Sequence, residues 1–216
     1  MLYLLVALAP VLIILVYIYV RDKYEKEPLS LLLKSLFFGG LIVLPVIYVE
    51  TSLTSVAAFT TRVSAAFYDA FIVAAITEEV FKFGILYLLI KKSPEFNERF
   101  DGIVYAVFIS LGFAAVENIL YVFDSGLNTG IARAFTAVPA HAFFGVSMGY
   151  YFALSKFKTE NTKLNLIKAL LIPILLHGVY DFILMVGNPI TLLFFIPFLI
   201  YMWVNGFKKI KKGAVK

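Results

Sequence analysis

The sequence contains no cysteine, and charged residues make up only 15% of its 216 positions. The lack of cysteine excludes disulfides, thiol nucleophiles and thiolate metal ligands. The low charge, together with 62% hydrophobic residues and a mean hydropathy of +0.92, excludes an ordinary soluble domain, because such domains are about a quarter charged. We therefore expect an all-α, multi-pass membrane protein, with one domain over residues 1–216 and short loops.

Apolar runs of about 18–24 residues recur along the chain, and each is long enough to cross a bilayer as a helix. They predict seven spans, at about Met1–Val20, Leu29–Val49, Phe67–Ile90, Gly102–Val122, Ala134–Leu154, Leu166–Met185 and Thr191–Gly206. The first run lacks a basic leader and a suitably placed cleavage site, so we interpret it as a retained span and not as a signal peptide. Pro45 is expected to bend the second span. The stretch Glu50–Ala66 fits either a loop or an interfacial helix.

The basic residues alternate between the two ends of these spans. Fifteen lysines and arginines lie in the loops and the tail that follow the odd-numbered spans, against two, Arg62 and Arg133, in the other loops. Because cytoplasmic loops carry the excess of basic residues, the N-terminus is expected outside and the C-terminus in the cytoplasm. The net charge of +5 is thus explained by topology, and we expect no nucleic-acid partner. Arg133 is interpreted as a solvated loop charge.

The third span contains the stretch Thr77-Glu78-Glu79-Val80-Phe81-Lys82, which places two carboxylates and one amine in an apolar run. A charge at the bilayer centre costs at least about 2.5–3.5 kcal/mol, so such residues indicate a functional site. On a helix, Glu78 and Lys82 lie one turn apart and can form an ion pair. Glu79 is rotated by about 100° and is expected to lack a local partner.

The remaining acids and imidazoles well inside the spans are predicted to lie at a similar depth. At a rise of about 1.5 Å per residue, the glutamate pair lies near the midplane and the others lie between it and the outer surface. These others are Glu117, His141, His177 and Asp181. His177 and Asp181 are one helical turn apart, which favours a His–Asp pair. We expect side chains from four spans to share one buried, water-reachable chamber.

This set of side chains suits the activation of water. A carboxylate held away from water is suited to act as a general base, and an imidazole or a second acid can polarise the scissile carbonyl. Zinc is an open alternative, with His141, His177, Glu117 and Glu79 as ligands, although the H-E-x-x-H pattern is absent. A proton-coupled transporter or channel uses similar residues. It is disfavoured because the acidic layer does not continue into the inner half.

Several motifs resemble the PrsW family of intramembrane proteases, which is related to the CAAX-processing type II proteases. They are Glu78-Glu79-x-x-Lys82, Phe113-x-x-x-Glu117-Asn118-x-x-Tyr121, His141 and His177-x-x-Tyr180-Asp181. Tyr24-Glu25-Lys26-Glu27-Pro28 and Phe100-Asp101-Gly102-Ile103-Val104-Tyr105 extend the resemblance over almost the whole chain. Glu117 stands where the more distant relatives have a histidine.

The resemblance implies a multi-pass protease of the bacterial plasma membrane. It implies a first cut, on the extracytoplasmic side, in a single-pass anti-sigma factor, within a signalling pathway that responds to envelope stress. It also implies that Glu78 and Glu79 are catalytic and that His177 assists them. We expect Asp181 to orient His177 and Lys82 to tune the glutamate pair. Glu117, His141 and Asn118 are expected to complete the chamber. The substrate's identity and the oligomeric state do not follow from the resemblance.

Overall fold

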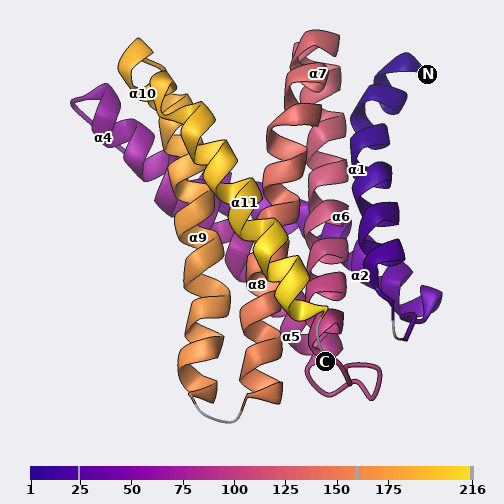
Figure 1. The fold of residues 1–216 in the computed structure, drawn as a ribbon. Coiled ribbons are helices and arrows are strands. Elements are labelled where there is room, and N and C mark those ends of the chain that lie inside the picture. Colours follow the sequence, from indigo (N-terminus) through magenta and orange to yellow (C-terminus); the bar gives the residue numbers. More distant parts are fainter. Residues whose placement is uncertain (24, 159–160, 215–216) are drawn as a thin grey trace.

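The computed structural model describes residues 1–216 except 24, 159–160 and 215–216. Tyr24 of the first family motif and Lys216 of the basic tail therefore lie outside the described residues. All regular structure in the described part is helical (Figure 1). The elements are α1 (Leu2–Arg21), α2 (Leu29–Leu41), α3 (Val43–Ser55), α4 (Arg62–Phe67), η1 (Tyr68–Ile76), α5 (Thr77–Ile90), α6 (Arg99–Ser125), α7 (Leu127–Phe135), α8 (Ala137–Phe157), α9 (Thr162–Val186), α10 (Pro189–Leu193) and α11 (Phe195–Gly213).

Five helical segments of the described chain are long and apolar enough to cross a membrane. They are Leu2–Arg21, Leu29–Ser55, Arg99–Ser125, Thr162–Val186 and Pro189–Gly213. Large apolar side chains are exposed along α1, α2, α9 and α11, as lipid contact requires. The all-α membrane class is thus confirmed. The predicted third and fifth spans, which correspond to α4–η1–α5 and α8, are helical but are not among the five segments. The count of seven and the direction of the chain remain predictions.

The predicted second span is divided into two helices. α2 ends at Leu41 and α3 begins at Val43, so the bend expected from Pro45 lies at Ile42. Proline has no backbone N–H, so the carbonyl of Leu41, four residues before Pro45, loses its helical hydrogen bond. The undecided stretch that follows contains the end of α3, an irregular connection over residues 56–61 and most of α4.

Helix α6 is the central element of the fold. It packs most extensively against α8, and it also contacts α1, α2 and α5. Glycines allow the closest approaches, since a Cβ at Gly149 of α8 would lie 2.1 Å from the carbonyl oxygen of Gly102. On the α2 side, a Cβ at Gly39 would lie 2.1 Å from the carbonyl oxygen of Ile109. Small residues thus fasten the helices on which the polar chamber is built.

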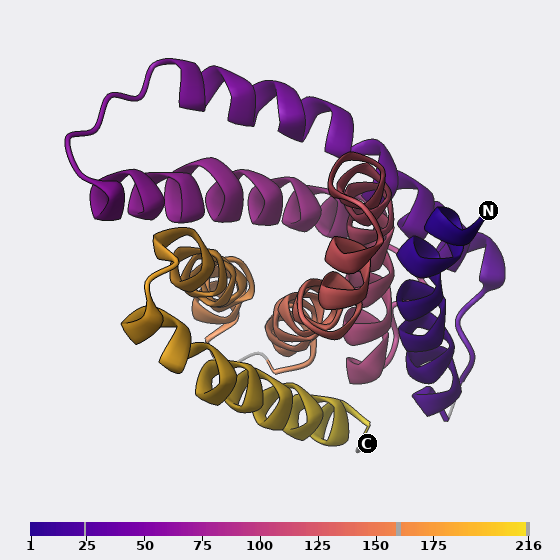
Figure 2. The same cartoon turned by 90° about the horizontal axis from the view of Figure 1, so that it is seen from above.

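The helices form a packed bundle when viewed from above (Figure 2). In that view α3 runs alongside η1 at one edge, and α9 packs against η1 from the opposite side. α11 crosses below α8 and α9 and contacts both. The interior where η1, α5, α6, α8 and α9 meet contains the polar residues identified in the sequence.

The segment η1 is a nine-residue π-helix that leads directly into α5. Wide π turns occur frequently at functional sites. A Cβ at Gly178 of α9 would lie 2.3 Å from the ring of Phe71, so any larger residue there would require this ring to move. Because η1 immediately precedes Thr77, its wider turns set the direction in which Glu78 and Glu79 project.

Candidate active site

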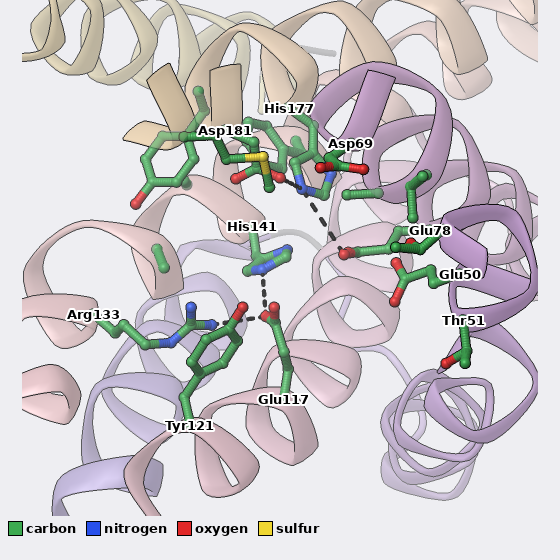
Figure 3. A pocket seen from close by; sticks show the side chains of 18 of the residues that line it. Glu50, Thr51, Asp69, Glu78, Glu117, Tyr121, Arg133, His141, His177 and Asp181 are labelled. Carbon is green, nitrogen blue, oxygen red and sulfur yellow. Dashed lines mark hydrogen bonds and ion pairs between the residues drawn. The ribbon is translucent and has the colours of Figure 1, made fainter. Parts of the chain in front are cut away.

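A cavity of about 680 Å³ lies among α3, η1, α5, α6, α8 and α9. Its walls include most of the residues singled out in the sequence, namely Glu78, Glu117, His141, His177 and Asp181 (Figure 3). Glu79 and Lys82 lie behind this wall, with 0% and 1% of their surfaces exposed. The structure therefore brings together all the acids and imidazoles that the sequence placed in one layer.

Lys82 is the centre of the buried charges. Its Nζ donates to Glu78 Oε2 at 2.8 Å and to Glu79 Oε1 at 2.9 Å. The same nitrogen lies 3.3 Å from His141 Nδ1 and 4.2 Å from the centre of the Phe113 ring. The expectation that Glu79 lacks a local partner is wrong, because residues three apart on a helix are also neighbours. One ammonium group thus bridges both carboxylates.

His177 is held by carboxylates on both sides of its ring. Its Nδ1 lies 3.1 Å from Glu79 Oε1, and its Nε2 lies 3.2 Å from Asp181 Oδ2. Glu78 Oε1 is 3.9 Å from the same Nε2. The ring stacks on Phe144 with a centroid distance of 4.9 Å. The contact expected between His177 and Asp181 is present, and the imidazole has little freedom to rotate.

Glu117 connects His141 to Arg133. Its Oε2 lies 2.9 Å from His141 Nε2 and accepts a hydrogen bond from Arg133 at 2.8 Å. The interpretation of Arg133 as a solvated loop charge is wrong, since its side chain is only 15% exposed. Asn118 is fully buried and donates from Nδ2 to the carbonyl oxygen of Ala7 at 2.8 Å. The amide of Asn118 thereby fastens α1 to α6.

The cavity also contains residues for which the sequence predicted no role. Glu50 and Thr51 enter from α3 and Asp69 from η1 (Figure 3). Tyr121, which the sequence showed only as the last residue of the Glu117 motif, enters from α6. Glu50 lies just beyond the predicted end of the second span. The helix continues for six residues beyond the predicted end, to Ser55. A predicted span of that length would have included Glu50 among the acids of the spans.

The two remaining family motifs meet away from this cavity. Glu27 and Asp101 are both buried and share a hydrogen bond, and the hydroxyl of Tyr105 donates to Glu27. Burial, together with the neighbouring charge of Asp101, raises the pKa of Glu27 to about 9. Asp22 is also buried nearby, and burial raises its pKa to about 6. Asp101 precedes Glu117 by about 24 Å along α6, so this acidic cluster is separate from the chamber.

The buried donors suit a metal ion by chemical type. One ligand atom each from Glu78, Glu79 and His141 lie within 4.8 Å of one another. One imidazole and two carboxylates are a donor set that zinc accepts, and Glu117 on the other nitrogen of His141 is the partner that a ligating histidine usually has. This group differs from the predicted set, which contained His177 and Glu117 in place of Glu78. The Lys82 ammonium contacts the same three side chains, so it would compete with a metal ion.

Comparison with known proteins identifies the family of the chain. Residues 27–204 match the model of a family described as PrsW family intramembrane metalloprotease. A protein named Protease PrsW from Oceanobacillus iheyensis is 39% identical over 206 residues, covering 95% of this chain and 93% of the relative. Relatives of the same name from Geobacillus kaustophilus and Bacillus subtilis are 38% and 34% identical, again over 95% of this chain and 89% and 93% of their own lengths. No solved structure shows a significant match. The chain is therefore a multi-pass bacterial membrane protein that belongs to the PrsW family of intramembrane proteases.

Proposed function

We propose that this protease hydrolyses a peptide bond of a single-pass membrane protein and that Glu78 is the base that activates water. One observation carries the choice of base. Glu78 lines the cavity, whereas Glu79 is fully buried behind it. Water in the cavity can reach the first carboxylate and not the second. Lys82 fixes Oε2 of Glu78 at 2.8 Å, whereas Oε1 lies 3.9 Å from Nε2 of His177, which also lines the cavity.

His177 would stabilise the negative charge that develops on the scissile carbonyl oxygen. Its ring lines the cavity beside Glu78, with 3.9 Å between His177 Nε2 and Glu78 Oε1. Glu79 and Asp181 hold the two ring nitrogens, so the imidazole is oriented before a substrate binds. Preorganised groups of this kind stabilise a transition state more effectively than groups that must first rearrange.

If the protein uses a metal ion, Glu78, Glu79 and His141 would hold it. Such an ion would acidify a bound water molecule and polarise the substrate carbonyl. The roles of Asp181 and Glu117 are unchanged in that case, because each orients an imidazole. The family description as metalloprotease favours a metal-dependent mechanism. The position of Lys82 favours a mechanism that uses side chains alone.

We infer that the substrate is an anti-sigma factor or a similar single-pass protein, cut near its extracytoplasmic end. The distribution of basic residues supports this side of the membrane, because the cavity lies in the half of the spans predicted to face outward. The polar residues that α3 contributes to the cavity wall, including Glu50 and Thr51, favour a substrate that is bound with its helix unwound. Backbone exposed by unwinding needs hydrogen-bond partners inside a membrane.

The proposal is tested by co-expression with a panel of tagged single-pass membrane proteins that includes anti-sigma factors. Glu78→Gln and Glu79→Gln are expected to abolish cleavage, the first by removing the base and the second by releasing His177 and Lys82. Asp124→Asn changes an exposed carboxylate of α6 and should cleave like the wild type. Undiminished cleavage by Glu78→Gln would remove this residue from the mechanism. A wild-type protein that cleaves no member of the panel would contradict the substrate class.

A further inference from the structure

Arg133 is the only lysine or arginine between Arg99 and Lys156 in the sequence. It lies on the short helix α7, which begins after Gly126 (φ 84°) and connects α6 to α8. Its guanidinium turns away from solvent toward one stretch of α6, where it contacts the side chains of Glu117 and Tyr121 (Figure 3). It also contacts the side chain of Asn118 on the same helix.

The contacts of Arg133 fix both the position and the plane of its guanidinium group. Nε donates to Asn118 Oδ1 at 2.9 Å, and a terminal nitrogen donates to Glu117 Oε2 at 2.8 Å. The guanidinium carbon lies 3.9 Å from the centre of the Tyr121 ring. Two directed hydrogen bonds and a stacked ring are interactions that arginine makes and lysine reproduces only in part.

Glu117 connects Arg133 to His141, a histidine of the chamber. The same Oε2 that accepts from Arg133 lies 2.9 Å from His141 Nε2, and the opposite nitrogen of that ring faces Lys82 at 3.3 Å. Side-chain carboxylates that hold the outer nitrogen of a functional histidine fix its tautomer and ring direction. His141 is thus held between the Arg133–Glu117 pair on one side and the Lys82 group on the other.

We propose that Arg133 is a positioning residue, which acts through Glu117 to hold His141 in its place beside the catalytic glutamates. The inference rests on the proposed function, because His141 is assigned to the chamber of that reaction. Without Arg133, Glu117 loses its only arginine partner among the described residues. Its carboxylate can then rotate, and the outer nitrogen of His141 is no longer held.

The activity test compares Arg133→Gln and Arg133→Lys with the wild type in the cleavage assay. Loss of a group that orients a functional histidine typically lowers activity by about 10- to 100-fold, and we expect this for Arg133→Gln. Arg133→Lys should recover part of the loss because it keeps the charge. In a Glu117→Gln background, Arg133→Gln should cause little further loss, because its effect passes through Glu117. Equal losses in both backgrounds would overturn the proposal.

Arg62→Gln is the matched control, since Arg62 is the only other arginine in the loops predicted to lie outside. It should cleave at the wild-type rate. A similar loss in this variant would show that any change of charge on that side reduces cleavage, and it would also overturn the specific role of Arg133.

A second readout is independent of cleavage. The chain contains two histidines, so selective labelling gives NMR signals from only two imidazole rings, which a His177→Asn variant assigns. Arg133→Gln should shift the ring signals of His141 more than those of His177, whose ring centre lies 5.5 Å away. Unchanged His141 signals would overturn the proposal. Because this measurement needs no substrate, it separates a failure of the Arg133 inference from a failure of the proposed function.

Discussion

Replacing Lys82 by methionine is expected to destabilise the protein strongly. The change removes the ammonium group that lies 2.8 and 2.9 Å from two buried carboxylates while preserving a long apolar side chain. Breaking a buried ion pair by removing one partner costs about 3–5 kcal/mol, because the remaining charge stays buried without compensation. For a chain of this length, about 2–4 °C of melting temperature corresponds to 1 kcal/mol, so we expect a decrease of roughly 6–20 °C.

The measurement is thermal unfolding of the purified protein in detergent. Lys34→Met is the matched control, because Lys34 is exposed on α2 and surface substitutions change stability by at most about 0.5 kcal/mol. Adding Glu79→Gln to Lys82→Met should recover part of the lost melting temperature, since one uncompensated carboxylate is then removed. A Lys82→Met protein that melts with the Lys34→Met control would refute the reasoning.

The same variant tests how Lys82 relates to a metal ion. Ammonium and a divalent cation would compete for the oxygens of Glu78 and Glu79, which lie with His141 in one group of ligand atoms. Lys82→Met should therefore retain more zinc than the wild type after dialysis against zinc and then buffer, measured by elemental analysis. Equal zinc content in the two proteins would show that the ammonium group does not control access to this site.

Two further predictions concern packing and pH. Gly39→Ala should lower the melting temperature and Gly84→Ala should not, because an added Cβ would lie 2.1 Å from the carbonyl oxygen of Ile109 at the first site and meets nothing within 4 Å at the second; equal effects in thermal unfolding would contradict the close contact of α2 with α6. The pKa of Glu27 is raised from 4.5 to about 9, so its contribution to stability is complete below pH 4.5 and is lost as the pH rises through 9. Melting temperatures measured from pH 7 to 9.5 should fall less steeply in Glu27→Gln than in the wild type, and parallel curves would refute this assignment.

Much of the site could be predicted from the sequence because the membrane penalises buried charge. Placing a glutamate pair and a lysine inside a bilayer costs free energy at any depth of the apolar core, so their position in the sequence is enough to indicate a function. The one-turn spacing of His177 and Asp181 likewise predicts their contact, which the structure contains. The motif around Glu117 is also visible in the sequence, but the role of each residue in it is not.

Periodicity within single helices fails where the partner comes from another element. Arg133 follows α6 by a short connection, and its place in a loop predicts a solvated charge, yet α7 folds back and directs it onto Glu117. Glu50 lies outside the predicted second span because the helix continues past the bend at Ile42 for longer than its hydropathy indicates.

The sequence by itself determined the class of the protein and the set of side chains available for chemistry. These follow from local quantities, namely hydropathy, spacing along a helix and the cost of charge in lipid. Only the tertiary structure decided which carboxylate lines the cavity, that Arg133 holds Glu117, and which nitrogen of each imidazole is occupied. Those choices depend on how neighbouring helices rotate and cross. Glycine contacts between helices and the wide turns of η1 determine this geometry, and neither can be read from the sequence of one helix alone.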